Sequence, residues 1–197
     1  MTMVADATVV LASSSPRRKQ LLEEAGIAFE AVDPPVAEPV DIQEGVLPAR
    51  LAEALAYFKA RSVAESRPNA LVLGADTVVS LAGEILGKPA DAEDARRMLH
   101  ALSDTRQAVI TGVALLGVRK RCIASETTYV TMRKITDDEI EQYIESGEWR
   151  GKAGAYAIQE TADRFVTAVE GSFSNVVGLP MELVTRLLRL AENRRQV

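Results

Sequence analysis

Residues 9–22 read Val-Val-Leu-Ala-Ser-Ser-Ser-Pro-Arg-Arg-Lys-Gln-Leu-Leu, and this stretch decides how the fold begins. The apolar, β-branched run that ends at Leu11 is typical of the end of a buried strand. Ser15 and Pro16 then predict a helix start, because serine is a favoured N-cap and proline suits the first helical position. Gly26 is a good terminator of that helix. The stretch therefore predicts a strand that leads into a helix through a short polar turn.

Two arginines, Arg17 and Arg18, lie in the first turn of this predicted helix. Cations are mildly unfavourable there, because the N-terminal end of a helix carries a partial positive charge. Free backbone N–H groups and two guanidinium groups would together favour an anion such as a phosphate. The alternative is a surface helix with two solvated arginines, and this stretch alone does not separate the two interpretations.

The composition is that of a globular chain, with 197 residues, 47% of them hydrophobic and 26% charged. This length fits one domain over residues 1–197, or two closely packed lobes that share a sheet. A net charge of -5 argues against a nucleic-acid-binding surface. No apolar run approaches the ~20 residues of a membrane span, and residues 1–8 lack a signal-peptide pattern. We therefore expect a cytoplasmic protein with neither a nucleic-acid nor a membrane partner.

Two residue types are nearly absent, which limits the chemistry. Cys122 is the only cysteine, so the chain has no internal disulfide and no thiolate metal site. His100 is the only histidine, and we expect it to be a solvated or half-packed helix residue. Ser-His-Asp triads and multi-histidine metal sites are thereby excluded. Acid–base or metal chemistry must therefore depend on carboxylates, lysines or arginines.

The order of the remaining patterns is mixed β and α, which indicates an α/β fold around a twisted sheet. Residues 46–64 predict a helix, and Lys59 lies near the edge of its apolar side, where snorkelling is the ordinary explanation. We expect that apolar side to be formed by six residues: Leu47, Leu51, Ala54, Leu55, Phe58 and Val63.

Asp76 interrupts the second informative stretch, Leu-Val-Leu-Gly-Ala-Asp-Thr-Val-Val at residues 71–79, which is typical of a buried strand. An unpaired carboxylate in such a strand costs several kcal/mol, so Asp76 must contact a cation, a metal or hydrogen-bond donors. A structural ion pair or a turn-capping role is the alternative to a functional one. Gly74 and Ala75 leave room for a ligand, which favours function.

Two further charged residues lie in loops. Glu38 follows a Pro-rich segment, where a solvated acid is the ordinary interpretation. Lys88 stands between glycine and proline, on a constrained loop that could return to the same cleft as Asp76.

The third stretch, Lys-Ala-Gly-Ala-Tyr-Ala-Ile-Gln at residues 152–159, is rich in small residues. Such residues are poor material for a side-chain core, and suit a backbone that a flat ligand approaches closely. Gln159 ends the stretch with donor and acceptor groups that can recognise a base edge. The alternative is a glycine-kinked strand packed on a helix. Residues 171–175 predict a polar loop before a last amphipathic helix.

Four spaced motifs resemble the Maf family of nucleoside triphosphate pyrophosphatases: Leu-Ala-Ser-x-Ser-Pro-Arg-Arg at 11–18, Gly-Ala-Asp-Thr at 74–77, Gly-Lys-Pro at 87–89, and the stretch at 152–159. Ser-Asn-Val-Val-Gly-Leu-Pro at 174–180 resembles the closing signature of the family. The resemblance implies an elongated, mixed, twisted β-sheet flanked by helices, with two lobes around a cleft, as in inosine triphosphatase and Maf-like folds. It also implies hydrolysis of a nucleoside triphosphate to the monophosphate and pyrophosphate, a house-cleaning of nucleotide pools.

The resemblance also implies roles for individual residues. Asp76, Lys88, Lys59 and Glu38 resemble the catalytic groups, and Mg²⁺ or Mn²⁺ would be held by Asp76 and Glu38. Substrate-binding positions are implied as a second set, of which Arg17, Thr77 and Gln159 bear on substrate choice: Ser13, Arg17, Arg18, Thr77 and Gln159.

Within the family, the third stretch with its terminal Gln159 resembles the dTTP/UTP branch. Ala157 and Glu160 stand where glycine is usual, which leaves the base preference open. The alternatives are a preference for 7-methyl-GTP or CTP, an inosine triphosphatase-type enzyme, and a non-catalytic regulator of cell division. Loss of activity is disfavoured, because the chain retains Asp76, Lys88 and both arginines of the first motif. The sequence leaves the metal identity and the oligomeric state open, a homodimer included.

Overall fold

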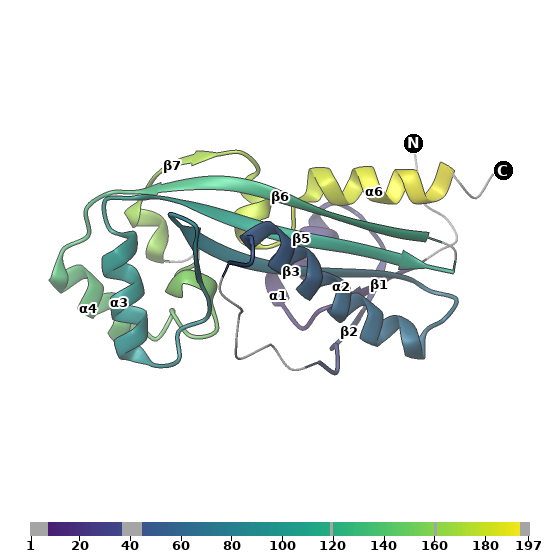
Figure 1. The fold of residues 1–197 in the computed structure, drawn as a ribbon, viewed down its shortest axis with the longest axis horizontal. Coiled ribbons are helices and arrows are strands. Elements are labelled where there is room, and N and C mark those ends of the chain that lie inside the picture. Colours follow the sequence, from purple (N-terminus) through teal and green to yellow (C-terminus); the bar gives the residue numbers. More distant parts are fainter. Residues whose placement is uncertain (1–7, 37–44, 119, 160, 194–197) are drawn as a thin grey trace.

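The computed structural model describes residues 8–36, 45–118, 120–159 and 161–193. A seven-stranded open sheet runs along the elongated molecule in the order β2-β1-β3-β5-β6-β7, with β4 paired to β3 (Figure 1). The parallel pairs β1–β2 and β1–β3 join antiparallel pairs elsewhere, so the sheet is mixed, as predicted. The strands are β1 Val9–Ala12, β2 Phe29–Val32, β3 Leu71–Leu81, β4 Glu84–Leu86, β5 Arg106–Gly117, β6 Lys120–Met132 and β7 Val166–Glu170.

Side-chain caps mark the starts of several helices, and the cap at Ser15 lies where the sequence predicted it. The Ser15 side chain accepts from the backbone N–H of Arg18, and Asp91 caps α3 in the same way. Thr136 and Glu139 form a capping box at α4, which ends at Gly147 in the left-handed conformation. The helices are α1 Pro16–Glu24, α2 Pro48–Ser66, α3 Ala92–Leu102, α4 Asp137–Ser146, α5 Phe173–Val177 and α6 Met181–Asn193, with 3₁₀ turns Ala153–Ala155 (η1) and Thr161–Phe165 (η2).

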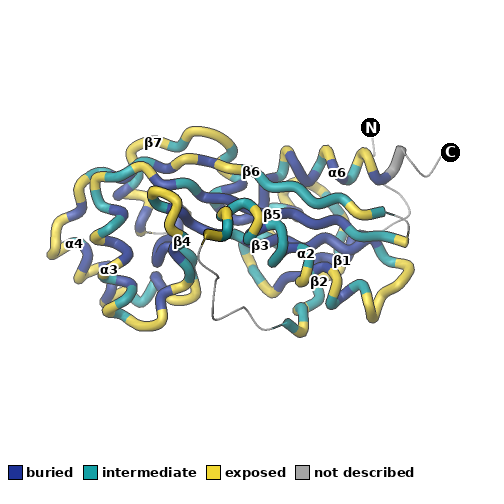
Figure 2. Tube along the Cα trace, in the orientation of Figure 1, coloured by how far each residue is buried: buried dark blue, intermediate teal, exposed yellow. Residues whose placement is uncertain are grey.

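The long strands β3, β5 and β6 extend through two lobes, each with its own core. In the first lobe, alternate residues of β3 face opposite helix layers: Leu73 contacts the core under α1 and α6, and Val72 the core under α2. The second lobe buries Leu99 of α3 and Tyr143 of α4 against the far end of the sheet. Buried residues therefore follow β3 and β5 along most of their length (Figure 2). No described helix is both long and apolar enough to cross a membrane.

Helix α2 packs on the sheet through a face that the sequence analysis did not predict. The alanines Ala52, Ala56 and Ala60 are fully buried, whereas Leu47 is 67% and Phe58 55% exposed. Of the predicted apolar side only Val63 is buried, so the prediction was wrong for its other members. The reason is steric: a Cβ placed on Gly74 of β3 would lie 2.8 Å from the Ala60 Cβ, and one on Gly112 of β5 would overlap the Ala52 backbone. Glycines beneath alanines bring the helix backbone close to the sheet, and Gly74 faces α2 rather than a ligand.

The structure also corrects the predicted polar loop at residues 171–175. Ser172 accepts a hydrogen bond from the backbone N–H of Asn175 and caps the short helix α5. Helix α5 ends at Gly178, whose φ of 123° favours glycine.

We expect Gly112→Ala to destabilise the protein by about 1–3 kcal/mol or more, because its Cβ would meet backbone that cannot move independently. Gly87→Ala is the matched control, since nothing lies within 4 Å of its added Cβ. Urea denaturation should place Gly87→Ala within about 0.5 kcal/mol of wild type. Equal unfolding midpoints for the two variants would contradict the close packing of α2.

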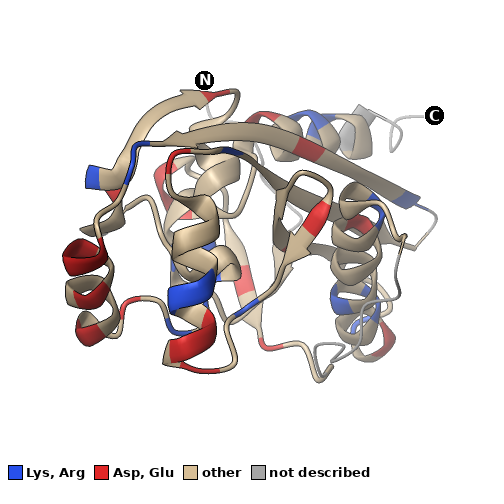
Figure 3. Cartoon of the chain, turned by 60° about the vertical axis from the view of Figure 1, so that its left-hand side comes forward, with Lys and Arg blue, Asp and Glu red and all other residues tan. Residues whose placement is uncertain are grey.

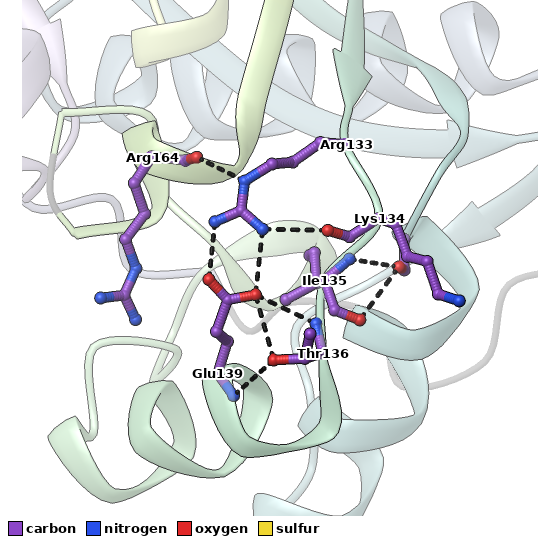
Figure 4. Close-up of polar contacts among 7 residues, drawn as sticks. Arg133, Lys134, Ile135, Thr136, Glu139 and Arg164 are labelled. Carbon is purple, nitrogen blue, oxygen red and sulfur yellow. Dashed lines mark hydrogen bonds and ion pairs between the residues drawn. The ribbon is translucent and has the colours of Figure 1, made fainter.

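A cluster of ion pairs and backbone contacts attaches α4 to the end of β6 (Figure 4). Arg133 donates to both carboxylate oxygens of Glu139, at 2.7 and 2.9 Å, and its Nε donates to the Arg164 carbonyl at 3.1 Å. The contact with Arg133, aided by the backbone N–H of Thr136, lowers the pKa of Glu139 to about 2.

This pKa makes stability depend on pH in a known direction. A carboxylate with a depressed folded-state pKa stabilises the fold fully above its unfolded pKa of about 4.3. That contribution is lost as the pH falls toward about 2, where the folded carboxyl itself is protonated. We expect the free energy of unfolding of wild type to exceed that of Glu139→Gln at pH 7, and the difference to shrink between about pH 4.3 and 2. A difference that does not vary with pH would contradict the assignment.

Candidate active site

A break in strand pairing marks the site. On one edge of β3, β1 pairs only as far as Ala12 opposite Gly74, and β4 begins to pair at Val79. Within the described residues, 75–78 of β3 therefore have no strand partner on that edge. A cavity of about 390 Å³ opens there, bounded by the N-terminal turn of α1, by α2, and by loops of the second lobe. The carboxyl end of a parallel strand at such an interruption is a usual ligand position in α/β folds.

Asp76 and Thr77 line the cavity from opposite faces of β3. Successive side chains of a strand point to opposite faces, so adjacent residues can contact different helix layers. Asp76 accepts a hydrogen bond from Lys59 of α2, on one face. Thr77 accepts one from Arg18 Nη2 of α1 at 3.1 Å, on the other. The cavity therefore wraps around the exposed edge of the strand.

Lys59 and Asp76 form a buried ion pair at the base of the cavity. Their side chains are only 14% and 11% exposed. The snorkelling explanation of Lys59 is wrong, because its ammonium is turned inward to the carboxylate. The sequence analysis required a partner for Asp76, and Lys59 is that partner. Because both groups also line the cavity, this ion pair does not by itself exclude a functional role.

The contacts of Arg18 include neutral acceptors in three parts of the described chain. Its Nε donates to the Gly178 carbonyl at 2.8 Å and its Nη1 to Ser13 Oγ at 3.4 Å, beside the contact with Thr77. Ser13 is itself buried, and its Oγ accepts from the backbone N–H of Ser15 at 3.2 Å. Arg17, the neighbour of Arg18, also lines the cavity.

The second lobe contributes the facing wall. The N–H of Gly154 donates to the Gly87 carbonyl at 3.0 Å, which joins the loop of Lys88 to η1. Gly154 needs its positive φ of 67°, and an added Cβ would lie 3.1 Å from Val79. The expectation that this small-residue stretch avoids the core was wrong, because Ala155 and Tyr156 belong to the core of the second lobe. Gln159 is exposed at the cavity wall.

The described cavity lining carries five cations and one carboxylate, that of Asp76. This excess opposes the net charge of -5 of the whole chain. Acidic residues gather elsewhere, as on the outward-facing helix α4, which carries five of them and no basic residue (Figure 3). A positively charged cavity in an acidic protein is suited to a polyanion. The five cations are Arg17, Arg18, Lys59, Lys88 and Lys152.

All the described residues that the sequence analysis selected line this one cavity: Ser13, Arg17, Arg18, Lys59, Asp76, Thr77, Lys88 and Gln159. Glu38 lies outside the described residues. The sequence analysis missed Lys152, although its position as the one charged residue at the start of the third stretch was a usable signal. It also missed that the Gly178 carbonyl accepts a hydrogen bond from Arg18, since no sequence pattern shows which donor a backbone oxygen will contact.

One family of known proteins matches nearly the whole chain. The family described as Maf-like protein matches residues 8–191. The chain belongs to the Maf family. Relatives of this Maf chain named dTTP/UTP pyrophosphatase include one from Salinibacter ruber, 48% identical over 92% of this chain and 89% of the relative. Others come from Ruminiclostridium cellulolyticum, 46% identical over 91% and 94%, and Koribacter versatilis, 45% identical over 93% and 94%.

In this Maf protein, we expect removal of the Lys59 charge and removal of the Asp76 charge to lower the free energy of unfolding by different amounts. Lys59→Met leaves a buried carboxylate without this cation, and we expect a loss of up to about 3 kcal/mol, the lower end for a broken buried pair. Asp76→Asn keeps an acceptor for the lysine and should cost less. Urea denaturation of both variants is the measurement. A Lys59→Met protein as stable as wild type would show that the pair does not support the fold.

Proposed function

We propose that this chain hydrolyses nucleoside triphosphates, dTTP and UTP foremost, to the monophosphate and pyrophosphate. The names of its relatives support the activity. The observation that carries the proposal is the cavity at the unpaired edge of β3, where five cations surround a single carboxylate. Such a charge arrangement suits a triphosphate, whose charge must be neutralised when pyrophosphate leaves.

We assign the phosphates to the α1 side of the cavity. The backbone N–H groups at the start of α1 and the Ser13 turn favour an anion, and Arg17 and Arg18 add charge-assisted donors. Lys88 and Lys59 approach from the facing loop and from α2. These donors would hold the triphosphate so that water attacks the α-phosphorus in line, and the bond to the bridging oxygen breaks to release pyrophosphate.

We assign Asp76 as the carboxylate that orients the attacking water and receives its proton. Lys59 donates to one of its carboxylate oxygens and so fixes the orientation of the side chain. The ammonium also lies where it can stabilise negative charge that builds up on the phosphate.

A divalent cation fits this donor set. Mg²⁺ is commonly bound by one or two carboxylates together with substrate phosphates, and Asp76 is the carboxylate available among the described lining residues. The described residues contain no group of three His, Cys, Asp or Glu that could hold a metal alone. We therefore propose that Mg²⁺ or Mn²⁺ binds with the nucleotide, at Asp76 and Glu38. Bound there, it would supply Lewis-acid stabilisation of phosphate charge.

We assign base recognition to Gln159 and the backbone of the 152–158 stretch. A side-chain amide can accept from the N3–H of uracil or thymine and donate to O4. We further propose a cytoplasmic location, because the composition is that of a globular chain. A homodimer is one of the oligomeric states that this proposal allows.

Wild-type protein should release pyrophosphate, with little orthophosphate, from UTP and dTTP in the presence of Mg²⁺ or Mn²⁺. We expect Asp76→Asn to lower kcat by ~10²-fold or more, because it removes an acid–base or metal-positioning group. Circular dichroism controls for folding. Orthophosphate as the primary product would overturn the proposed reaction, and a near-native kcat for Asp76→Asn would make that residue structural.

Gln159→Glu should lower kcat/KM for UTP by about 5- to 150-fold, because it replaces a donor to O4 with a carboxylate. Gln142→Glu is a matched control, since Gln142 lies exposed on α4 away from the cavity. Values of kcat/KM for UTP, dTTP and CTP measure the effect. If the ranking and the UTP efficiency are unchanged, Gln159 does not recognise the base.

A further inference from the structure

A second threonine lies directly behind Thr77, outside the cavity. Thr111 of β5 is the register partner of Thr77 and is fully buried. Its Oγ1 lies 2.9 Å from Thr77 Oγ1, and it donates to the main-chain carbonyl of Asn175, in α5, at 3.2 Å. Thr111 does not line the cavity, so it cannot contact a ligand there.

The direction of these hydrogen bonds follows from counting protons. A hydroxyl has one proton to donate and two lone pairs that accept. The main-chain carbonyl of Asn175 can only accept, and Thr111 donates to it at 3.2 Å. With its proton used there, Thr111 accepts from Thr77. Thr77 has then used its proton, and its remaining lone pairs accept from Arg18. The bonds thus run one way, from the guanidinium through Thr77 and Thr111 to the carbonyl of Asn175.

Helix α5 holds both ends of this chain of hydrogen bonds. Asn175 is fully buried, and its Nδ2 donates to the Val109 carbonyl at 2.9 Å and to Thr128 Oγ1 at 3.0 Å. Three residues later, the Gly178 carbonyl accepts from Arg18 Nε. Two of the contacts that orient Arg18, those with Gly178 and Thr77, therefore depend on where α5 sits, beside its contact with Ser13.

We propose that Thr111 and Asn175 are positioning residues that orient the guanidinium of Arg18 through Thr77. This inference rests on the proposed function for its meaning in catalysis, although the orientation of Arg18 can be measured without turnover. It also gives Thr77 a definite role, as the link in this chain rather than a contact to the base.

Removing Thr111 Oγ1 would redirect the proton of Thr77. Among the described residues, the Gly178 carbonyl is a further acceptor for Thr77, at 3.5 Å, and its second lone pair can take this proton beside Arg18 Nε. Rotation of the Thr77 hydroxyl toward this carbonyl would turn away the lone pairs that accept from Arg18, and the guanidinium would lose that contact. A group that binds the phosphates equally well in ground and transition states affects KM more than kcat.

The test compares Thr111→Val with Thr111→Ser, which keeps the hydroxyl, and with the control Thr105→Val. Thr105 is half-buried just before β5, and its Oγ1 donates to the Leu102 carbonyl at 2.8 Å, a bond that involves neither α5 nor Arg18. Heteronuclear NMR of the Arg18 Nε–Hε group, assigned by its absence from Arg18→Lys, reports orientation through exchange with water. Pyrophosphate release from UTP gives KM and kcat.

For Thr111→Val we expect Nε–Hε exchange and KM to rise roughly tenfold, with kcat within about threefold. Thr111→Ser should restore both, and Thr105→Val should leave both near wild type. The proposal is overturned if Thr111→Val changes neither, if serine does not rescue, or if Thr105→Val has the same effect as Thr111→Val. Wild type without pyrophosphate release would overturn the proposed function alone, since the NMR comparison still decides the positioning role. If Thr111→Val does not fold, Thr77→Val removes the same link at its half-buried end.

Discussion

The close approach of helix α2 to the sheet is the constraint on which the site depends. Gly74 and Gly112 have no Cβ, and Ala52, Ala56 and Ala60 lie over them, so the helix backbone almost touches two strands. Larger residues on either side would move the helix outward by several ångströms. At the present distance, Lys59 of the same helix contacts Asp76 of β3. Small residues at the packing face thus determine where the charged residues meet.

The end of β1 is the second constraint. Because that strand stops at Ala12 and β4 begins to pair only at Val79, the middle of β3 is open on one edge. Side chains from both faces of the strand then line one cavity, with the Lys59–Asp76 pair on one side and Arg18 with Thr77 on the other. A continuous sheet would separate these two groups. Positive charge concentrates at this interruption, while acidic residues gather on α4 (Figure 3).

Caps, turns and motif residues were predictable because their signals are local. Ser15, Asp91 and the Thr136–Glu139 box set helix starts through bonds within one turn of the chain. The packing face of α2 was mispredicted because alanine carries little apolar signal, and only the glycines of distant strands favour burying it. Short α5 was taken for a loop since five residues are too few for a periodic pattern.

The sequence by itself determined the mixed α/β class, the family and eight of the residues that line the cavity, because spaced motifs identify residues without regard to geometry. It also required a partner for Asp76, since an unpaired buried carboxylate is too costly. Only the tertiary structure decided that this partner is Lys59, that Lys152 joins the cavity, and that Thr111 supports Arg18 from behind. These contacts join residues far apart in the chain, and their geometry depends on strand register and helix distance, which no local pattern encodes.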